Sequence, residues 1–381
     1  MADDGPPPRI CQVVSQYHPQ ASGAERQALL QGAELVRRGH IVHVMTQSIP
    51  GQPRDETVQG VHIHRWVDVI RVGPLFGVTF VLGMIRSLRK LRPEYDLIHT
   101  HQGLWEAIAT GAGRGFLSGA PTIVQPASSG YFGEAEELVR TKGHELLRRA
   151  ILRNSRLVAI STEIAEQWKR LGWEDSRVFP LASGVDADHF HPGPSLVEGQ
   201  LPSRPRVVFT GRIHRQKNLD LLLDAWPVVA KATGASLVLV GGGPERERLE
   251  ARCHALQVSD SVIFTGPVDD PAEYLRGADL FVLPSVAEGM SNSLLEAMAT
   301  GLACVASNIG GNIDLLCAGT GRLVDPDPAC WSESLIALLT NDVERRSLGQ
   351  AARRLIEHKY ALPVIMDRYV ALYRSLLAPS H

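Results

Sequence analysis

Two glutamates, Glu288 and Glu296, flank a short run of small and polar residues that suits a ligand with hydroxyl and phosphate groups. This motif follows the strand-like segment 280–283 and leads into a helix-like segment, so Glu288 lies in a loop and Glu296 about one turn inside the helix. Backbone N–H groups at a helix N-terminus attract anions. One carboxylate can accept hydrogen bonds from sugar hydroxyls and the other from ribose hydroxyls, with phosphates on the amides between. The alternative is a capping carboxylate and a solvated glutamate.

Two cations, Arg212 and Lys217, lie five positions apart in a loop that follows the strand-like segment 206–210. An arginine offers a planar fork of donors and a lysine a point charge, a combination suited to a diphosphate. A solvated basic loop explains them equally well. The next strand-like segment ends in the glycine run 241–243, which lets a ligand approach the backbone but lacks the G-x-G-x-x-G spacing of dinucleotide-binding turns. A tight structural turn explains this run equally well.

Histidine pairs with one residue between them occur three times, and each pair could contribute to a metal site. The pairs are His62 with His64, His99 with His101, and His189 with His191. No third ligand at a sensible spacing accompanies any pair. We therefore predict no metal.

These motifs occur in an order that resembles the group 1 glycosyltransferases (glycosyltransferase family 4), which have the GT-B fold. In the second half the resemblance rests on G-R-x-x-x-x-K-N from Gly211, V-G-x-G-P from Val240, F-x-G-x-V from Phe264, the two glutamates, and Gly310-Gly311. In the first half it rests on Ser22-Gly23-Ala24-Glu25, His99-Thr100-His101, Ser183-Gly184-Val185-Asp186 and Phe190-His191-Pro192. It covers nearly the whole chain, and the combination is far more specific than any one motif.

The resemblance implies an enzyme that transfers a sugar from a nucleotide-diphosphate donor, most often a UDP-sugar, without a cofactor or metal. It implies that Arg212 and Lys217 neutralise the donor diphosphate, and that Glu288 contacts the sugar and Glu296 the ribose. It places His101 beside the reacting sugar. The other donor-binding positions that it implies are Gly23, Gly266, Val268, Gly289, Met290, Ser291 and Asn292. Ser22 stands where the family more often has glycine, which narrows the loop before Gly23.

The resemblance also implies that the anomeric configuration is retained. Glycosyl transfer passes through an oxocarbenium-like transition state in which charge builds on the leaving group, so fixed cations and helix amides should supply much of the rate. No matched motif supplies a carboxylate nucleophile on the far face of the ring. We therefore expect same-face substitution, in which the departing phosphate oxygen accepts the proton of the acceptor.

The elements that must position these residues alternate between strand-like and helix-like segments in both halves of the chain. This alternation predicts an α/β fold with two Rossmann-like, doubly wound domains, each with a parallel sheet covered on both faces. We place the acceptor-side domain at residues 1–183 and the nucleotide-sugar domain at 184–359, with a C-terminal helix in 360–381 that returns to the first domain. The Pro-, Gly- and Ser-rich segment 182–205 reads as the connector. We expect the active site in a cleft between the domains.

Composition narrows the class of protein further. The net charge of −2 over 381 residues argues against a nucleic-acid binder. The acidic, Pro-rich start is no signal peptide, and the longest apolar run, 72–85, is too short to span a bilayer. Five cysteines without a CxxC pair suit a reducing compartment. We expect a soluble, cytoplasmic protein.

Two basic stretches in the first half leave a membrane question open. Arg86, Arg89, Lys90 and Arg92 follow an apolar run, and a second group comprises Arg140, Lys142, Arg148, Arg149 and Arg153. We interpret them as solvated helix faces, with weak peripheral contact to an anionic membrane as the alternative.

The sequence leaves the acceptor open among glycans, lipid-linked precursors and small metabolites. A nucleotide-sugar epimerase of the same fold and a non-catalytic sugar-nucleotide binder are the rival functions.

Overall fold

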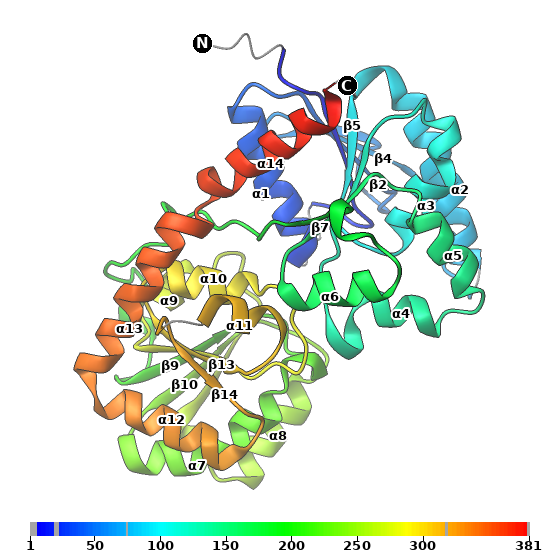
Figure 1. The fold of residues 1–381 in the computed structure, drawn as a ribbon. Helices are drawn as coiled ribbons and strands as arrows, with labels where there is room; N and C mark the ends of the chain where they lie inside the picture. Colours follow the sequence, from blue (N-terminus) through cyan, green and yellow to red (C-terminus); the bar gives the residue numbers. More distant parts are fainter. Residues whose placement is uncertain (1–5, 19–22, 74, 317–318, 379–381) are drawn as a thin grey trace. The chain divides into compact units, whose positions relative to one another are not determined.

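The chain forms two compact units, each built around one sheet (Figure 1). The computed structural model describes residues 6–18, 23–73, 75–316 and 319–378. The first unit comprises Met1–Gly184 together with Leu362–His381, and the second comprises Val185–Ala361. The last helix of the chain therefore belongs to the first unit, although the whole second unit precedes it in the sequence.

The first unit has an eight-stranded sheet in the order β3-β4-β2-β1-β5-β6-β7-β8. Its strands are β1 (Ile10–Val13), β2 (Val42–Gln47), β3 (Asp55–Val58), β4 (Val61–Val67), β5 (Leu97–Thr100), β6 (Thr122–Val124), β7 (Arg156–Ala159) and β8 (Val178–Pro180). All pairings are parallel except that of β3 with β4. The central strands β1 and β5 are buried along their whole length, as expected for a parallel sheet covered on both faces.

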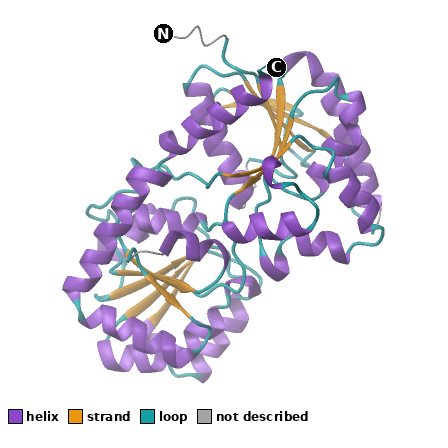
Figure 2. Cartoon of the chain, viewed as in Figure 1, coloured by secondary structure: helices purple, strands orange, loops and turns teal. Residues whose placement is uncertain are grey.

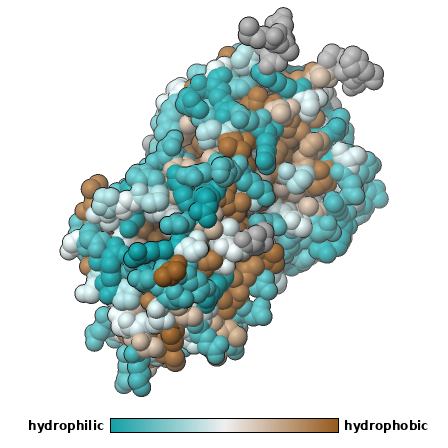
Figure 3. All heavy atoms as spheres, turned by 60° about the vertical axis from the view of Figure 1, so that its left-hand side comes forward, coloured by the Kyte–Doolittle hydropathy of each residue, from teal (hydrophilic) through white to brown (hydrophobic). Residues whose placement is uncertain are grey.

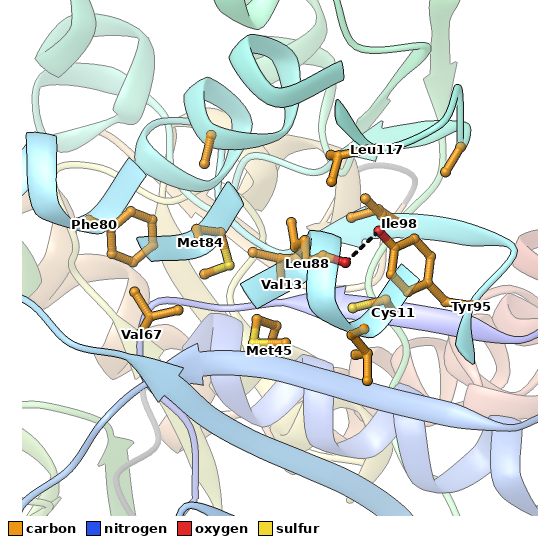
Figure 4. Close-up of a cluster of buried hydrophobic side chains, with 13 residues drawn as sticks. Cys11, Val13, Met45, Val67, Phe80, Met84, Leu88, Tyr95, Ile98 and Leu117 are labelled. Carbon is orange, nitrogen blue, oxygen red and sulfur yellow. Dashed lines mark hydrogen bonds between the residues drawn. The ribbon is translucent and has the colours of Figure 1, made fainter. Parts of the chain in front are cut away.

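Helices pack on the two faces of this sheet (Figure 2). They are α1 (Gly23–Arg37), α2 (Leu75–Leu91), α3 (Trp105–Gly113), α4 (Glu134–Arg140), α5 (His144–Ile151), α6 (Thr162–Arg170) and α14 (Leu362–Leu377). Figure 4 shows the core beneath α2, where Phe80, Met84 and Leu88 pack on side chains of β1, β2 and β5. The Tyr95 hydroxyl in this core donates to the Leu88 carbonyl at 3.1 Å, so this buried hydroxyl group is satisfied.

Two details of the first unit go beyond the sequence-based expectation. The helical stretch 134–151 is interrupted, because Gly143 takes a left-handed backbone (φ +77°) between α4 and α5. The antiparallel strand β3 was not expected. Its four residues alternate between exposed and half-buried, so it has no apolar pattern to reveal it.

The second unit has a six-stranded, wholly parallel sheet in the order β11-β10-β9-β12-β13-β14. Its strands are β9 (Arg206–Thr210), β10 (Ser236–Val240), β11 (Val262–Gly266), β12 (Leu280–Leu283), β13 (Ala303–Ser307) and β14 (Arg322–Val324). Its helices are α7 (Leu219–Thr233), α8 (Arg246–Ala255), α9 (Ala272–Arg276), α10 (Asn292–Ala299), α11 (Gly310–Leu316), α12 (Pro328–Thr340) and α13 (Asp342–Leu355). The apolar runs of β9, β10 and β12 are buried between helices, which explains their continuous rather than alternating hydrophobicity.

Of the segment 182–205, expected as a connector, the residues from Val185 on belong to the second unit and are packed onto it at their start. The guanidinium of Arg353 on α13 donates to the carbonyls of Ala187 and Phe190 at 2.9 and 2.8 Å, and to that of Ala299 at 2.6 Å. Phe190 itself is buried. One arginine thus fixes this irregular stretch against the helices behind it.

The surface drawn in Figure 3 is mostly hydrophilic, with apolar residues reaching it in several places. Within the described residues, no helix combines the length and the hydrophobicity that crossing a membrane requires.

Candidate functional site

The loops of interest in the second unit leave the carboxyl ends of β9 and β12, which are neighbours at the middle of the sheet. From β9 the chain runs through α7 to β10 on one side, and from β12 it runs through α10 to β13 on the other. In doubly wound sheets, ligands bind at the carboxyl edge where the direction of the connections reverses in this way. The motif with Arg212 and Lys217 and the motif with Glu288 and Glu296 therefore both lie at that edge.

An ion pair joins the two motifs directly. The Lys217 ammonium lies 2.5 Å from Oε1 of Glu288, with only 18% and 8% of the two side chains exposed. Gln216, beside the lysine, fastens the same two loops: its side-chain amide donates to the Ala287 carbonyl and its own carbonyl accepts from the Val286 N–H, both at 2.9 Å. The sequence separates Lys217 and Glu288 by 71 residues, and the structure places them side by side at the switch point.

The glycine run 241–243 allows the neighbouring loop to pass against it backbone to backbone. A Cβ on Gly241, whose φ is +142°, would lie 1.9 Å from the Gly211 carbonyl oxygen, and one on Gly243 would lie 2.1 Å from that of Ile213. The Ile213 N–H donates to the Gly242 carbonyl at 2.8 Å, and the Gly211 N–H to that of Val240 at 3.0 Å. The structural explanation of these glycines therefore holds: they position the loop that carries Arg212 and Lys217.

The helix after Glu288 begins where the sequence indicated. The Ser291 hydroxyl caps α10 by accepting from the Leu294 N–H, and Glu296 lies just over one turn inside that helix. Glu288, Met290, Ser291 and Glu296 are each less than a tenth exposed. Their polar groups therefore face an environment in which hydrogen bonds and charges act more strongly than they do in open water.

A second glycine contact supports this loop from α11. A Cβ on Gly311 would lie 2.0 Å from the Gly289 carbonyl oxygen, and the Gly311 N–H donates to the Glu288 carbonyl at 3.3 Å. The pair Gly310-Gly311 stands in the sequence as part of the family pattern, and the structure gives it a physical role.

The remaining predicted positions of the second unit lie at the same edge. Gly266 ends β11 with φ +82°, and its carbonyl accepts from the Gly241 N–H at 3.0 Å. Val268 follows it and is half-buried. Arg212 is exposed in the loop after β9, whereas Lys217 is enclosed.

The first unit has its own switch point, between β1 and β5, and His101 lies there. The His101 N–H donates to the Val13 carbonyl at 3.0 Å, and its ring is 1% exposed. Neither ring nitrogen has a hydrogen-bond partner among the described residues. Burial, and secondarily the neighbouring His99, hold the pKa of His101 well below its usual value, so the ring is neutral.

The helix α14 holds His99, whose ring lies against that of His101, with 4.3 Å between the ring centroids and 32° between the ring planes. The Nε2 of His99 lies 3.0 Å from Oε1 of Gln125, and its Nδ1 lies 2.9 Å from the Tyr373 hydroxyl. Since Tyr369 also donates to that amide oxygen, the oxygen acts as an acceptor, and His99 carries its proton on Nε2 and accepts from Tyr373. Burial lowers the pKa of His99 to about 3.

A buried carboxyl group completes this edge of the first unit. Glu106, in the first turn of α3, is bonded to the Ser15 hydroxyl after β1 and is 1% exposed. Burial raises its pKa to about 7, against the lowering effect of that bond, and the charges of Glu134 and Glu25 add to the rise.

Gly23, predicted near phosphate and sugar, is the first residue of α1 and is exposed. Ser22 lies outside the described residues.

The sequence reasoning missed several residues of these two edges. Gln216 sat inside a recognised motif without a distinguishing feature, and Glu106 resembled any acidic residue of a first helical turn. Tyr369 and Tyr373 lie four apart on the last helix, a spacing that indicates one helix face but no partner. On β2 and β4, His43, His62 and His64 form a stacked group, with His43 Nδ1 3.0 Å from His64 Nε2.

The models of two protein families match this chain. "Glycosyltransferase Family 4" matches residues 21–189 and "Glycosyl transferases group 1" matches residues 204–341. The D-inositol 3-phosphate glycosyltransferase of Salinispora arenicola is 31% identical over 344 residues, which are 79% of this chain and 75% of that protein.

Solved structures share the fold over nearly the full length. Sucrose-phosphate synthase from Thermosynechococcus elongatus superposes with a TM-score of 0.81 at 22% identity, covering 98% of this chain and all of that one. The Anabaena protein Alr3699/HepE, solved in complex with UDP-glucose, has a TM-score of 0.79 at 17% identity, covering 96% of this chain and 99% of its own.

Proposed function

Because this chain belongs to the group 1, family 4 glycosyltransferases and has their GT-B fold, we propose that its donor is a nucleotide-diphosphate sugar held by the second unit. The observation that supports this donor best is the Lys217–Glu288 pair at the β9–β12 switch point. An ammonium enclosed beside a helix N-terminus is a site for phosphate, and a carboxylate next to it is an acceptor for sugar hydroxyls. UDP is the nucleotide we propose first, since a protein of the same fold binds UDP-glucose.

Donor binding would redistribute the contacts of this pair. A diphosphate brings negative charge to Lys217, which then turns its ammonium from Glu288 toward the phosphate oxygens. Arg212, exposed on the same loop, adds a second cation, and the amides around Gly289 to Asn292 at the start of α10 add donors. Glu288 is thereby released to accept from the hydroxyls of the sugar, and Glu296 accepts from the ribose. Gly266 and Val268 frame the base.

These groups act on the leaving group rather than on a covalent intermediate. Cations and amides fixed before reaction stabilise the charge that develops on the departing diphosphate. We propose that the sugar is transferred with retention, by same-face substitution, and without a metal ion. Trapping of a glycosyl group on any aspartate or glutamate of the chain would contradict this route.

The first unit would bind the acceptor, whose hydroxyl is that of a glycan, a lipid-linked precursor or a small metabolite. His101 and Gly23 lie at its carboxyl edge, and the neutral ring of His101 can exchange one hydrogen bond with a sugar hydroxyl at either nitrogen.

An outward stripe on α2 supports peripheral contact with an anionic membrane at the inner face of the cell membrane. Leu75, Val78 and Leu82 are 51%, 54% and 64% exposed at helical spacing, and Arg86 and Arg89 continue the same stripe. Apolar residues can enter the interface while the cations meet lipid phosphates. Sedimentation with phosphatidylglycerol vesicles should be lost in Leu82→Glu; equal sedimentation of the variant and the unaltered protein would refute the contact.

The donor is tested by a thermal-shift screen of UDP, GDP and ADP and their sugars, because a ligand that binds the native state raises the melting temperature. We expect one nucleoside diphosphate to raise it and the others to have little effect. Product analysis with that sugar nucleotide alone then separates transfer from epimerisation, since an epimerase needs no acceptor. No response to any of them would refute the proposed donor class.

A further inference from the structure

A cavity of about 560 Å³ lies in the first unit, away from the carboxyl edge that carries His101. Its lining includes Pro121 before β6, Arg156 at the start of β7 and Arg177 just before β8. Since β5, β6, β7 and β8 run parallel, these are the amino ends of the strands, at the opposite edge of the sheet. The end of α14, with Ser375 and Leu376, completes the wall. The cavity is therefore separate from the predicted transfer site.

The charge of the lining has one sign. Arg114, Arg156 and Arg177 all face the cavity, and no aspartate or glutamate occurs among the described residues that line it. Burial lowers the pKa of Arg177; Glu174, outside the lining, opposes this, and the charges of Arg156 and Arg114 add to it. Three guanidinium groups thus lie close enough to repel one another around a space that can hold a small molecule.

Backbone carbonyls satisfy only some of the donors on these arginines. Arg177 donates to the Leu152 carbonyl at 2.8 Å and to that of Asn154, and Arg156 to that of Ser155 at 2.9 Å. Arg114 donates to the Arg153 carbonyl. These bonds hold the turn 152–155 between α5 and β7, which accounts for part of the cluster.

These bonds to carbonyls do not use all of the N–H donors on the three arginines. A guanidinium has five N–H donors, and the Nε of Arg156 is buried without a partner among the described residues. Ser155 and Ser375 add hydroxyl groups to the same wall. A phosphate group, with its oxygens and negative charge, matches both the unused donors and the excess of positive charge.

We propose that this cavity binds a phosphate-bearing ligand at a second site of the chain, distinct from the donor site. The source of the phosphate is either a soluble phosphorylated compound or the headgroup of a phospholipid, and the test below distinguishes the two. The site depends on Arg114 and Arg156 for affinity, whereas Arg177 mainly holds the backbone around it.

Calorimetric titration of the full-length protein with inorganic phosphate tests the site. The titration is made with and without saturating UDP, so that phosphate at the proposed donor site is displaced while phosphate in the cavity remains. The double variant Arg114→Gln/Arg156→Gln should bind phosphate at least about tenfold more weakly, because two charge-assisted contacts are lost. Binding that disappears once UDP is present, or that is unchanged in the double variant, overturns the proposal.

The matched control is Arg149→Gln, on α5 outside the lining, where the guanidinium is 72% exposed and pairs with Glu145. It should leave phosphate affinity unchanged. If circular dichroism shows that the double variant is unfolded, Arg156→Lys replaces it: the charge is kept but the fork is lost, and severalfold weaker binding is expected. Unaltered affinity in that variant contradicts the proposal.

Sedimentation with vesicles identifies the source of the phosphate. Phosphatidylcholine vesicles are compared with and without phosphatidic acid, for the unaltered protein and for the double variant. Retention that needs both phosphatidic acid and the two arginines assigns the site to a lipid headgroup. Loss of inorganic phosphate binding in the variant with unchanged vesicle retention assigns it to a soluble compound. If neither phosphate binding nor vesicle retention depends on the two arginines, the site is refuted, whether or not nucleoside diphosphates bind the second unit.

Discussion

The two units share one architecture, but the carboxyl edges of their sheets differ in charge. At the β9–β12 switch point of the second unit, an ammonium and a carboxylate are paired and a guanidinium lies exposed nearby. At the β1–β5 switch point of the first unit, burial keeps His101 neutral and raises the pKa of Glu106 to about 7. The architecture provides a switch point in both units, whereas the side chains decide whether that position suits an anion or a neutral polar ligand.

The difference also concerns how each edge is held. Glycines let the loops of the second unit touch through their backbones, as at Gly241 and Gly311. Side chains hold the edge of the first unit, where Tyr373 fixes His99 and the ring of His99 lies against that of His101. A site held by backbone contacts needs glycines, which can be recognised in the sequence. A site held by side chains needs only polar residues, which do not stand out.

The largest effect is expected in the second unit, from Glu288→Ala. Turnover should fall by about 10³-fold or more, because an acceptor that acts on the sugar in the transition state is lost. Nucleotide binding should survive, since Lys217 and Arg212 remain. Initial rates and calorimetry measure the two properties separately. Glu247→Ala, an exposed glutamate of α8, is the control with unchanged rates. Near-normal turnover in Glu288→Ala would remove the proposed role.

In the first unit, the raised pKa of Glu106 should make the free energy of unfolding depend on pH. The pKa of Glu106 rises from 4.5 to about 7 on folding. Between those values the native chain keeps a proton that the unfolded chain has lost, so the free energy of unfolding falls as the pH rises through this window. Glu106→Gln should remove this slope and stabilise the protein above pH 7 by up to about 3 kcal/mol.

Urea unfolding across pH 4 to 8 measures this effect, with Glu136→Gln, which changes an exposed glutamate of α4, as the control. An identical pH slope for Glu106→Gln and the unaltered protein would show that this carboxyl ionises normally, and the contrast between the two edges would then be wrong.

A smaller effect is expected from Tyr373→Phe. The buried Nδ1 of His99 loses its donor, which should lower the free energy of unfolding by about 1 kcal/mol. If His101 acts in transfer, kcat should fall as well, while the KM for the donor stays the same. Tyr131→Phe, which removes a hydroxyl from a side chain that is 70% exposed, should change neither property. An unchanged free energy of unfolding in Tyr373→Phe would show that α14 does not position His99.

The sequence predicted the second unit better than the first, for physical reasons. Lys217 and Glu288 are recognisable because glycines and a helix start surround them locally, and Glu296 lies inside α10 as expected. Their contact could not be derived, because it depends on which strands are neighbours in the sheet. Glu106 and His99 owe their character to burial and to α14, which returns from the far end of the chain. No local pattern indicates such a contact.

Calorimetric titration of UDP into the unaltered protein, Lys217→Met and Arg215→Met tests the central claim most directly. Arg215 lies two positions from Lys217 but is 79% exposed and pairs with Glu245. The account predicts that UDP binds the unaltered protein and Arg215→Met equally, and binds Lys217→Met at least about tenfold more weakly. Equal affinity in all three proteins, or the absence of UDP binding in all three, would contradict it.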